Sequence, residues 1–226
     1  MSANNVFVIV PACNEQETIY QTVLSLLQMK MNVIVVDDGS RLSQFQFLKT
    51  LPVYYIRHAI NLGQGAALQT GTEFALEKGA DFIIHFDADG QHQPNDLPGL
   101  LKPLLDNKAD LVMGSRFLSH SNKIPFLRTY LLKTARWVNY CFTGILLSDA
   151  HNGLRAFNRN TAQELKFTEN RMSHATELLF HIKRYQWRWC EVSVNILYKN
   201  DPMRRGQSTL NSVRIFFDLL LYKFFQ

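Results

Sequence analysis

Short apolar runs alternate with amphipathic segments through the first half of the chain. Five runs rich in β-branched and aromatic residues predict strands, at residues 5–10, 32–36, 53–56, 81–86 and 110–113. Most of them are continuously apolar, which is typical of strands covered on both faces in a parallel sheet. Segments 15–28, 64–78 and 94–107 carry apolar residues at helical spacing. The alternation predicts βαβ units, and therefore an α/β fold with a mostly parallel central sheet flanked by helices.

The pattern changes after Gly114. Two further helices are predicted, at residues 123–145 and 175–185, and a strand is predicted near 190–196. A polar, basic loop follows at 201–208, and residues 209–226 read as an amphipathic, aromatic-rich helix. No repeat, low-complexity tract or linker interrupts the chain, so we expect a single domain over residues 1–226.

Composition narrows the class of protein without selecting a function. Hydrophobic residues make up 46% of the chain and charged residues 19%, which favours a folded globular protein over extended disorder. The formal net charge of +5 suits anionic partners such as nucleotides and phospholipid headgroups. A nucleic-acid partner would rest on this charge alone, and we expect none.

The cysteines and the N-terminal segment indicate a reduced compartment. Cys13, Cys141 and Cys190 are odd in number and widely spaced, so they form neither a disulfide framework nor a CxxC metal site. The N-terminus lacks the basic segment and apolar core of a signal peptide. No run approaches the ~18 to 20 apolar residues that span a bilayer. We therefore expect a cytoplasmic chain.

Segment 85–94, HFDADGQHQP, carries the most informative polar residues. A buried strand ends there in two carboxylates, Asp87 and Asp89, followed by the amide of Gln91 and the imidazole of His92. In open α/β sheets, ligands bind beyond the carboxyl ends of the strands. Hard oxygen ligands in that place suit Mg²⁺ or Mn²⁺ holding a diphosphate. An Asp-rich turn without a ligand is the simpler alternative, because Asp is common in turns.

Two other predicted strands also end in polar clusters. Asp37 and Asp38, in VVDDGS, follow the second strand, while Asn14 and Glu15, in PACNEQET, follow the first. Asn14 is in addition a candidate N-cap of the first helix. All three strand ends should lie on the same edge of the sheet. A ligand cleft requires that arrangement, whereas core packing does not.

Taken in order and spacing, six segments resemble glycosyltransferase family 2, which has the GT-A fold. They are PACNE, VVDDGS, NLGQGAALQTG, DADGQHQP, GSR and HNGLRAF. The likeness is strongest to the branch of dolichyl- and polyprenyl-phosphate sugar synthases and to related bacterial polysaccharide enzymes. It extends from about residue 6 to residue 208. By this resemblance, residues 1–115 form the half that binds the nucleotide sugar, and residues 116–208 form the acceptor half.

The resemblance implies a site for the base and ribose of the sugar nucleotide. Pro11, Glu15, Val36 and Asp38 match the family positions that hold these groups. Carboxylates there can accept hydrogen bonds from ribose hydroxyls. Cys13 stands where the family usually has an aromatic residue, so the resemblance leaves stacking on the base open.

The resemblance also implies a diphosphate site with a divalent cation. Asp87, Ala88 and Asp89 match the DxD motif that contacts the diphosphate through Mg²⁺ or Mn²⁺, and Gln91 matches a further metal ligand. Arg116, in GSR, matches an arginine near the phosphates. A cation and an arginine together can neutralise a departing diphosphate.

NLGQGAALQTG is glycine-rich but lacks the GK[ST] of a P-loop. It also lacks a GxGxxG in register, because Gly63 and Gly65 are followed by Leu68. We therefore interpret these glycines as a backbone turn that begins a helix, with Asn61 facing the cleft.

The acceptor half contains two candidate catalytic carboxylates. Asp149 and the HNGLR segment at 151–155 together resemble the DxxxGFR segment of the family, with Leu154 in place of Phe. Glu177 falls where related enzymes carry a glutamate near the acceptor. Either suits a general base for transfer to a sugar hydroxyl, whereas an anionic phosphate acceptor has less need of one. A structural role for Glu177 at the helix N-terminus is the alternative.

The C-terminal part suggests a mobile basic loop and contact with a membrane. Segment 199–208 resembles the RxxGxS loop of the family, in which Arg204 and Arg205 would close over the diphosphate. The register is offset, because the family arginine falls here on Met203. The amphipathic segment 209–226 suits peripheral docking at the inner face of a membrane. Packing against the core or against a membrane partner protein is the alternative.

Together these features predict an inverting, metal-dependent hexosyltransferase. The donor would be a UDP- or GDP-linked sugar, and the resemblance implies a polyprenyl phosphate or a lipid-linked saccharide as the acceptor. Two other functions remain open. One is a non-catalytic subunit that binds nucleotide sugars within a membrane complex, and the other is a sugar nucleotidyltransferase. The second alternative lacks the glycine- and lysine-containing triphosphate loop expected near the first strand.

Overall fold

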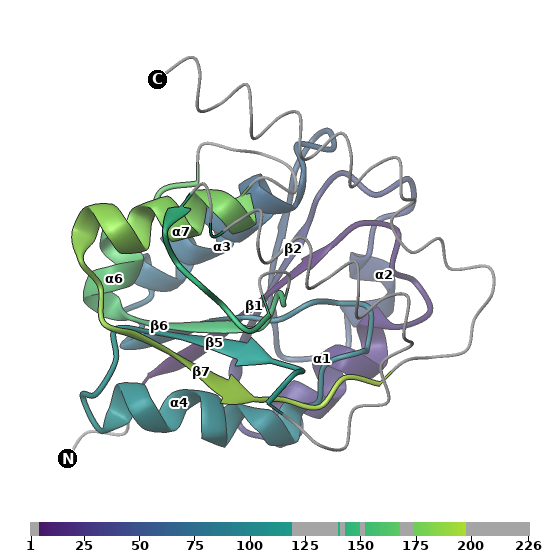
Figure 1. The fold of residues 1–226 in the computed structure, drawn as a ribbon. Coiled ribbons are helices and arrows are strands. Elements are labelled where there is room, and N and C mark those ends of the chain that lie inside the picture. Colours follow the sequence, from purple (N-terminus) through teal and green to yellow (C-terminus); the bar gives the residue numbers. More distant parts are fainter. Residues whose placement is uncertain (1–4, 119–139, 141–142, 150–151, 168–173, 198–226) are drawn as a thin grey trace, which may run out of the picture.

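The computed structural model describes residues 5–118, 140, 143–149, 152–167 and 174–197. Within these ranges the chain forms one sheet with helices on both faces (Figure 1). The strands are β1 (Val6–Ala12), β2 (Asn32–Asp37), β3 (Tyr54–Arg57), β4 (Phe82–His85), β5 (Leu111–Ser115), β6 (Arg155–Asn158) and β7 (Trp189–Ser193). The helices are α1 (Ile19–Gln28), α2 (Phe45–Leu48), α3 (Gln64–Glu77), α4 (Leu97–Leu105) with a 3₁₀ turn at Pro94–Asp96, α6 (Arg159–Glu164) and α7 (His174–Tyr185).

The described strands form a seven-stranded, mostly parallel sheet, as the sequence predicts. Their order is β3-β2-β1-β4-β6-β5-β7, and only β6 runs antiparallel to its neighbours among them. Because β6 is reversed, its first residue, Arg155, pairs with His85, the last residue of β4. The chain just before β6 therefore lies at the carboxyl end of β4, beside the predicted DxD.

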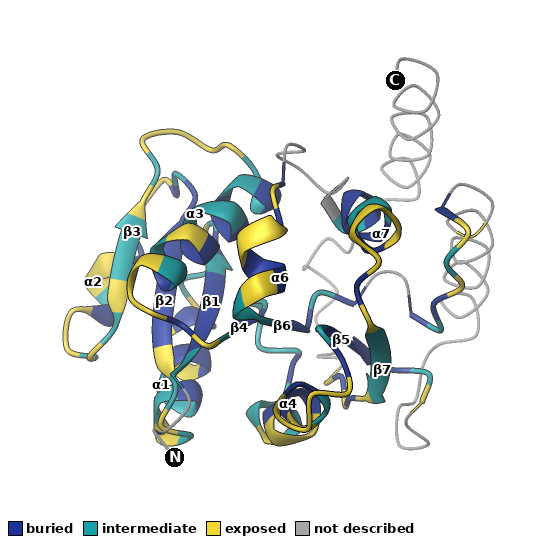
Figure 2. Cartoon of the chain, turned by 90° about the vertical axis from the view of Figure 1, so that its left-hand side faces the viewer, coloured by how far each residue is buried: buried dark blue, intermediate teal, exposed yellow. Residues whose placement is uncertain are grey.

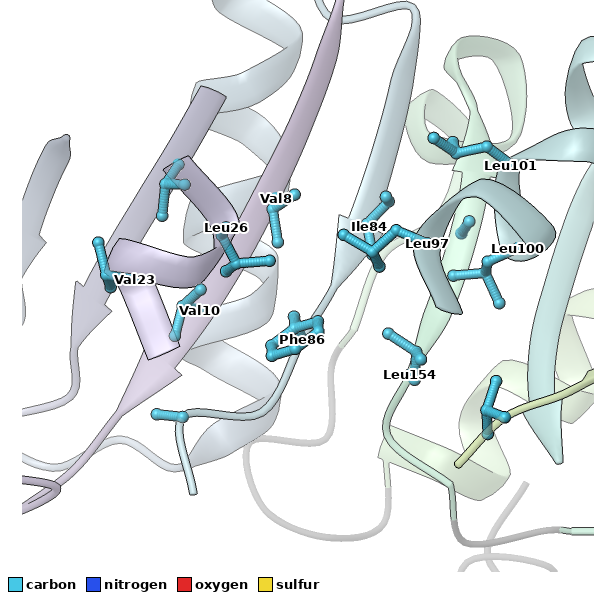
Figure 3. Close-up of a cluster of buried hydrophobic side chains, with 14 of the residues drawn as sticks. Val8, Val10, Val23, Leu26, Ile84, Phe86, Leu97, Leu100, Leu101 and Leu154 are labelled. Carbon is cyan, nitrogen blue, oxygen red and sulfur yellow. The ribbon is translucent and has the colours of Figure 1, made fainter. Parts of the chain in front are cut away.

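Two hydrophobic layers cover the sheet, one on each face. Val8 and Val10 of β1 pack with α1 and α4, and Figure 3 shows side chains from both helices around Ile84 and Phe86. The alternate residue Ile9 points to the other face, where α3, α6 and α7 lie (Figure 2). Full burial of one such side chain stabilises the fold by roughly 1.5–3 kcal/mol. Burial on both faces explains the continuously apolar strands.

The first helix begins later than the sequence suggests, and Asn14 is not its N-cap. Helix α1 starts at Ile19, and Thr18 occupies the N-cap position without a side-chain cap. Asn14 has a positive φ of 60° instead. Its backbone N–H donates to Ser40 Oγ (2.9 Å), and its side-chain oxygen accepts from the backbone N–H of Arg41 (3.0 Å). The side chain thus joins the first loop to the second and is not available to the helix.

Three short elements were not expected from the sequence: α2, α6 and β6. Each has four to six residues, too few for a clear period of 3.6 or 2. The predicted helix at 123–145 lies largely outside the described residues. The basic loop at 201–208 and the amphipathic segment 209–226 lie entirely outside them. In the described part of the chain, no helix combines the length and the hydrophobicity needed to cross a bilayer.

Candidate functional site

A cleft of about 500 Å³ opens at the carboxyl ends of β1, β2 and β4. These strands are neighbours and parallel, so their ends meet at one edge of the sheet. The beginning of α3 completes the wall. Eight of the residues proposed from the sequence as donor ligands line the cleft, namely Pro11, Cys13, Glu15, Asp38, Asn61, Asp87, Ala88 and Asp89.

The carboxylate of Asp38 organises one wall of the cleft. Its Oδ1 accepts the backbone N–H of Leu62 (2.9 Å), and its Oδ2 accepts that of Gly63 (2.7 Å). His58 Nδ1 lies 2.8 Å from Oδ1. Gly63, with φ of 107°, is the N-cap residue of α3, as expected for a glycine turn before a helix. Asp38 therefore shapes the loop as well as lining the cleft.

The neighbouring carboxylate, Asp37, is fully buried and serves the fold. It accepts hydrogen bonds from the backbone N–H groups of Ser40 (2.9 Å) and Gln44 (3.0 Å) and from the hydroxyl of Tyr55 (2.5 Å). Burial alone would raise the pKa of Asp37, but these hydrogen bonds outweigh it and hold the pKa below its ordinary value. Asp37 thus anchors the turn that carries Asp38.

Cys13 and Asn61 meet across the cleft. Asn61 Nδ2 donates to the backbone oxygen of Asp38 (3.2 Å) and contacts Cys13 Sγ at 3.1 Å. Burial, together with nearby carboxylates, raises the pKa of the Cys13 thiol. The thiol is therefore protonated at neutral pH. It presents a small, soft surface in the place of the aromatic ring that the resemblance leads us to expect.

Asp87 and Asp89 converge on the cleft from the end of β4. Asp87 Oδ1 accepts from Gln64 Nε2 (2.8 Å), and its Oδ2 accepts from His92 Nε2 (3.2 Å). Asp89 Oδ1 accepts the backbone N–H of Gln91 (2.9 Å). Gln64 was not identified from the sequence, because its segment was interpreted only as a helix-starting turn. His92 was noted in its motif without a role.

Asp87 and Asp89 fit a divalent cation whose remaining ligands come from a substrate. The described residues contain no group of three or more His, Cys, Asp or Glu side chains placed to hold a metal. Mg²⁺ commonly binds through one or two carboxylates plus substrate phosphates and water. Asp87 and Asp89 provide this kind of partial site. Gln91, also predicted as a ligand, does not line the cleft, and its backbone O accepts from Leu197.

A second buried polar cluster lies at the carboxyl end of β5. Arg116 Nε donates to Asp149 Oδ2 at 2.6 Å, and the backbone N–H of Arg116 donates to the same oxygen at 3.0 Å. Asn152 Nδ2 approaches that oxygen at 3.4 Å. Both side chains of the ion pair are buried. The structure thus joins two residues, 33 positions apart, that the sequence suggested separately.

Arg155 connects the two clusters electrostatically. It is only 4% exposed, and burial lowers the pKa of its guanidinium to about 10, while the charges of Asp87 and Asp149 raise it. A protonated Arg155 therefore offsets the repulsion between the two carboxylates. Arg155 had no predicted role of its own, although it is the last residue of the HNGLR segment.

Two other predicted residues, Val36 and Glu177, do not line the cleft. The side chain of Val36 is fully buried in the layer under α3, because position 36 points into the sheet packing and not beyond its edge. Glu177 is buried in the first turn of α7, with Oε1 3.9 Å from His181 Nε2. Arg204 and Arg205 lie outside the described residues.

Comparison with known proteins adds independent information. The profile described as glycosyl transferase family 2 matches residues 7–166. A UDP-N-acetylglucosamine–dolichyl-phosphate N-acetylglucosaminyltransferase of Methanococcus voltae is 29% identical, over 99% of this chain and 98% of the relative. A polyprenol monophosphomannose synthase of Mycolicibacterium smegmatis is 30% identical, over 70% of this chain and 63% of the relative.

The fold also has a close match among solved structures. Glucosyl-3-phosphoglycerate synthase from Mycobacterium tuberculosis, solved with Mn²⁺, UDP and glucosyl-3-phosphoglycerate, gives a TM-score of 0.72. Its sequence identity is 18%, over 97% of this chain and 78% of that structure. The likeness establishes the GT-A fold.

Proposed function

The chain belongs to glycosyl transferase family 2 and is a glycosyltransferase, and we propose that it transfers a hexose from a nucleoside diphosphate sugar to a polyprenyl phosphate. One observation carries the proposal. The ends of three adjacent parallel strands place Asp38, Asp87 and Asp89 around one cleft of about 500 Å³. That volume falls within the range of small-molecule sites.

The donor would lie along the cleft from β2 to β4. Its base and ribose would lie against Pro11, Cys13, Glu15 and Asn61, and its diphosphate near residues 87–89. Both carboxylate oxygens of Asp38 already accept backbone N–H groups of the loop. Asp38 could therefore bind the ribose only through its remaining lone pairs. We therefore assign Asp38 chiefly to shaping the wall.

A divalent cation, Mg²⁺ or Mn²⁺, fits beside Asp87 and Asp89. When bound, it would neutralise charge on the departing diphosphate. The chain itself would orient Asp87 through Gln64 and His92, and Asp89 through the backbone of residue 91. Such supporting hydrogen bonds set the direction in which a carboxylate presents its lone pairs.

The acceptor is proposed to be a phosphate because the second cluster holds a buried arginine, Arg116, and its described residues include no carboxylate left over as an evident general base. Asp149 Oδ2 is already bonded to Arg116, and its Oδ1 is buried without a hydrogen-bond partner among the residues that the structure describes. An acceptor phosphate is anionic and can attack without losing a proton. Asp149 would then hold Arg116 in place, and Arg116 would stabilise phosphate charge. The names of both relatives include such a lipid, dolichyl phosphate in one and polyprenol monophosphomannose in the other.

The reaction would proceed by direct displacement. An acceptor phosphate oxygen forms a bond to the anomeric carbon, while the bond to the nucleoside diphosphate breaks and the diphosphate leaves with the electron pair. Attack opposite the leaving group inverts the anomeric configuration. Because the acceptor is a lipid, the chain would work at a membrane surface.

The proposal is tested by incubating the purified chain with radiolabelled UDP- or GDP-hexoses, Mn²⁺ and polyprenyl phosphate in detergent. Labelled lipid should form with one nucleotide family, and NMR should show an inverted anomeric centre. Asp89→Asn should abolish the product, whereas Glu77→Gln, at an exposed position of α3, should retain it.

Other outcomes would replace the proposal. Transfer to a lipid-linked saccharide, with none to the phosphate, would show the acceptor assignment to be wrong. Donor binding without turnover on either acceptor would favour the non-catalytic subunit.

A further inference from the structure

Glu191 lies in the middle of β7, on the face of the sheet opposite to α1 and α4. Its neighbours Cys190 and Val192 pack against the hydrophobic layer of those helices. Since alternate residues of a strand point to opposite faces, Glu191 points to the other side. There it meets Ser148 and Asp149, which are more than 40 residues away in sequence.

The carboxylate of Glu191 accepts hydrogen bonds from the backbone N–H groups of Ser148 and Asp149 and from the hydroxyl of Ser148. The N–H of Ser148 lies 2.9 Å from Oε1 and 2.8 Å from Oε2. Ser148 Oγ donates to Oε1 at 2.8 Å, and the N–H of Asp149 donates to it at 3.1 Å. With its oxygens occupied in this way, Glu191 is better suited to fix the backbone than to contact a substrate.

The same carboxylate ends a directed chain of hydrogen bonds from β5. The backbone N–H of Phe117 donates to Ser115 Oγ (3.2 Å), and Ser115 Oγ lies 2.6 Å from Ser148 Oγ. Since Ser148 Oγ gives its one proton to Glu191, Ser115 is the donor in that contact. Chains of this kind polarise each bond along them. They tie the residues on both sides of Arg116 to residue 148.

We infer that Glu191 is a positioning residue, which fixes the backbone of Ser148 and Asp149 so that Asp149 meets Arg116. Asp149 receives the N–H and the Nε–H of Arg116 on one oxygen, an arrangement that tolerates little displacement of its backbone. In this way Glu191 sets the direction of the Arg116 guanidinium. The expected effect of Glu191 on kcat rests on the proposed function, whereas its effect on the position of Arg116 does not.

The first experiment is independent of activity. In the ¹H–¹⁵N NMR spectrum of the full chain, the Nε–H of Arg116 should be slow to exchange, and Arg116→Lys identifies it by its loss. Glu191→Gln removes the negative charge and puts an amide NH₂ in place of one of the two oxygens that accept the Ser148 N–H, so this protected signal should disappear while the dispersed core signals remain. Glu77→Gln is the matched control and should keep it. Retention of the signal in Glu191→Gln would overturn the inference.

The second experiment uses the transfer assay. Glu191→Gln should lower kcat at least about tenfold and change donor KM less than about twofold, because the donor cleft is untouched. In an Asp149→Asn background, Glu191→Gln should add less than about twofold, because residues acting as one unit are not additive. Multiplicative losses would refute the inference. An inactive wild type whose Nε–H signal still depends on Glu191 would count against the proposed function alone.

A milder variant covers the case in which Glu191→Gln does not fold. Glu191→Asp keeps the negative charge but withdraws the carboxylate by one methylene from the backbone N–H groups of Ser148 and Asp149. It should fold, speed the exchange of the Arg116 Nε–H and lower kcat by about threefold to tenfold at unchanged donor KM. Wild-type exchange and kcat in Glu191→Asp would refute the inference.

Discussion

Gly153 lies directly against the carboxylate of Asp87. A Cβ added at Gly153 would stand 2.3 Å from Asp87 Oδ2 and 2.9 Å from its Cγ, closer than real Cβ contacts come. The contact spans 66 positions and exists because β6 runs antiparallel beside β4. Position 153 therefore favours glycine, because any side chain there would collide with the carboxylate of Asp87 where it lines the cleft.

Gly153→Ala should impair donor binding more than stability. The atom in the way is the end of a side chain, so Asp87 can rotate aside at little cost in folding free energy, but it then no longer faces the cleft. We expect metal-dependent binding of the donor nucleotide to weaken at least about tenfold, since misplacements of about 1 Å have such effects. Isothermal titration with UDP and GDP in Mn²⁺ measures it. Gly99→Ala is the control, because a Cβ there meets open space. Equal binding by both variants would contradict the prediction.

The ion pair between Arg116 and Asp149 should show strong energetic coupling. Both side chains are buried, so Asp149→Asn leaves an uncompensated charge and should cost about 3 kcal/mol in the free energy of unfolding. Adding Arg116→Met should recover part of that loss, because no buried charge then remains without its partner. Urea unfolding of the two single variants and the double variant gives the coupling. Strictly additive losses would show that the pair is not coupled in solution.

Asp37 should make the protein sensitive to acid. Its folded-state pKa lies below the ordinary value of about 3.9. Its carboxylate therefore stabilises the fold above that pH, and this contribution is lost as the pH falls through the lower folded-state pKa. Asp37→Asn should be less stable than wild type at pH 7, and the difference should shrink as the pH falls below about 4. Urea titrations at these pH values test it, and a constant difference would contradict the sign.

Cys13 should report occupancy of the cleft. Its raised pKa keeps it a thiol at neutral pH, so alkylation by iodoacetamide should be slow at pH 7 and faster as the pH rises. Nucleoside diphosphate with Mn²⁺ should protect Cys13 because both occupy the same cleft. Cys190, a free cysteine on β7, should react at the same rate with and without nucleotide. Peptide mass spectrometry separates the two sites, and equal protection of both would argue against binding in the cleft.

Local sequence patterns predicted much of the fold and of the cleft. The apolar runs at residues 5–10, 32–36 and 81–86 correspond to β1, β2 and β4, and four of the carboxylates after them, Glu15, Asp38, Asp87 and Asp89, line one cleft. Parallel strands bring their carboxyl ends to the same edge, so position along the chain was enough to place Asp38, Asp87 and Asp89 together. The side chain of Val36 does not line this cleft, because a residue inside a strand covered on both faces is buried.

The sequence alone determined the alternation of strands and helices, the carboxylates at the strand ends and the motifs that resemble the family. These signals are local, because hydrophobic period and turn chemistry depend on neighbouring residues. Only the tertiary structure decided which distant groups meet. It inserts the four-residue β6 antiparallel between β4 and β5. That insertion sets Gly153 against Asp87, while the loop before β6 sets Asp149 against Arg116 and Glu191. Such contacts follow from the order and direction of strands, which no local period encodes.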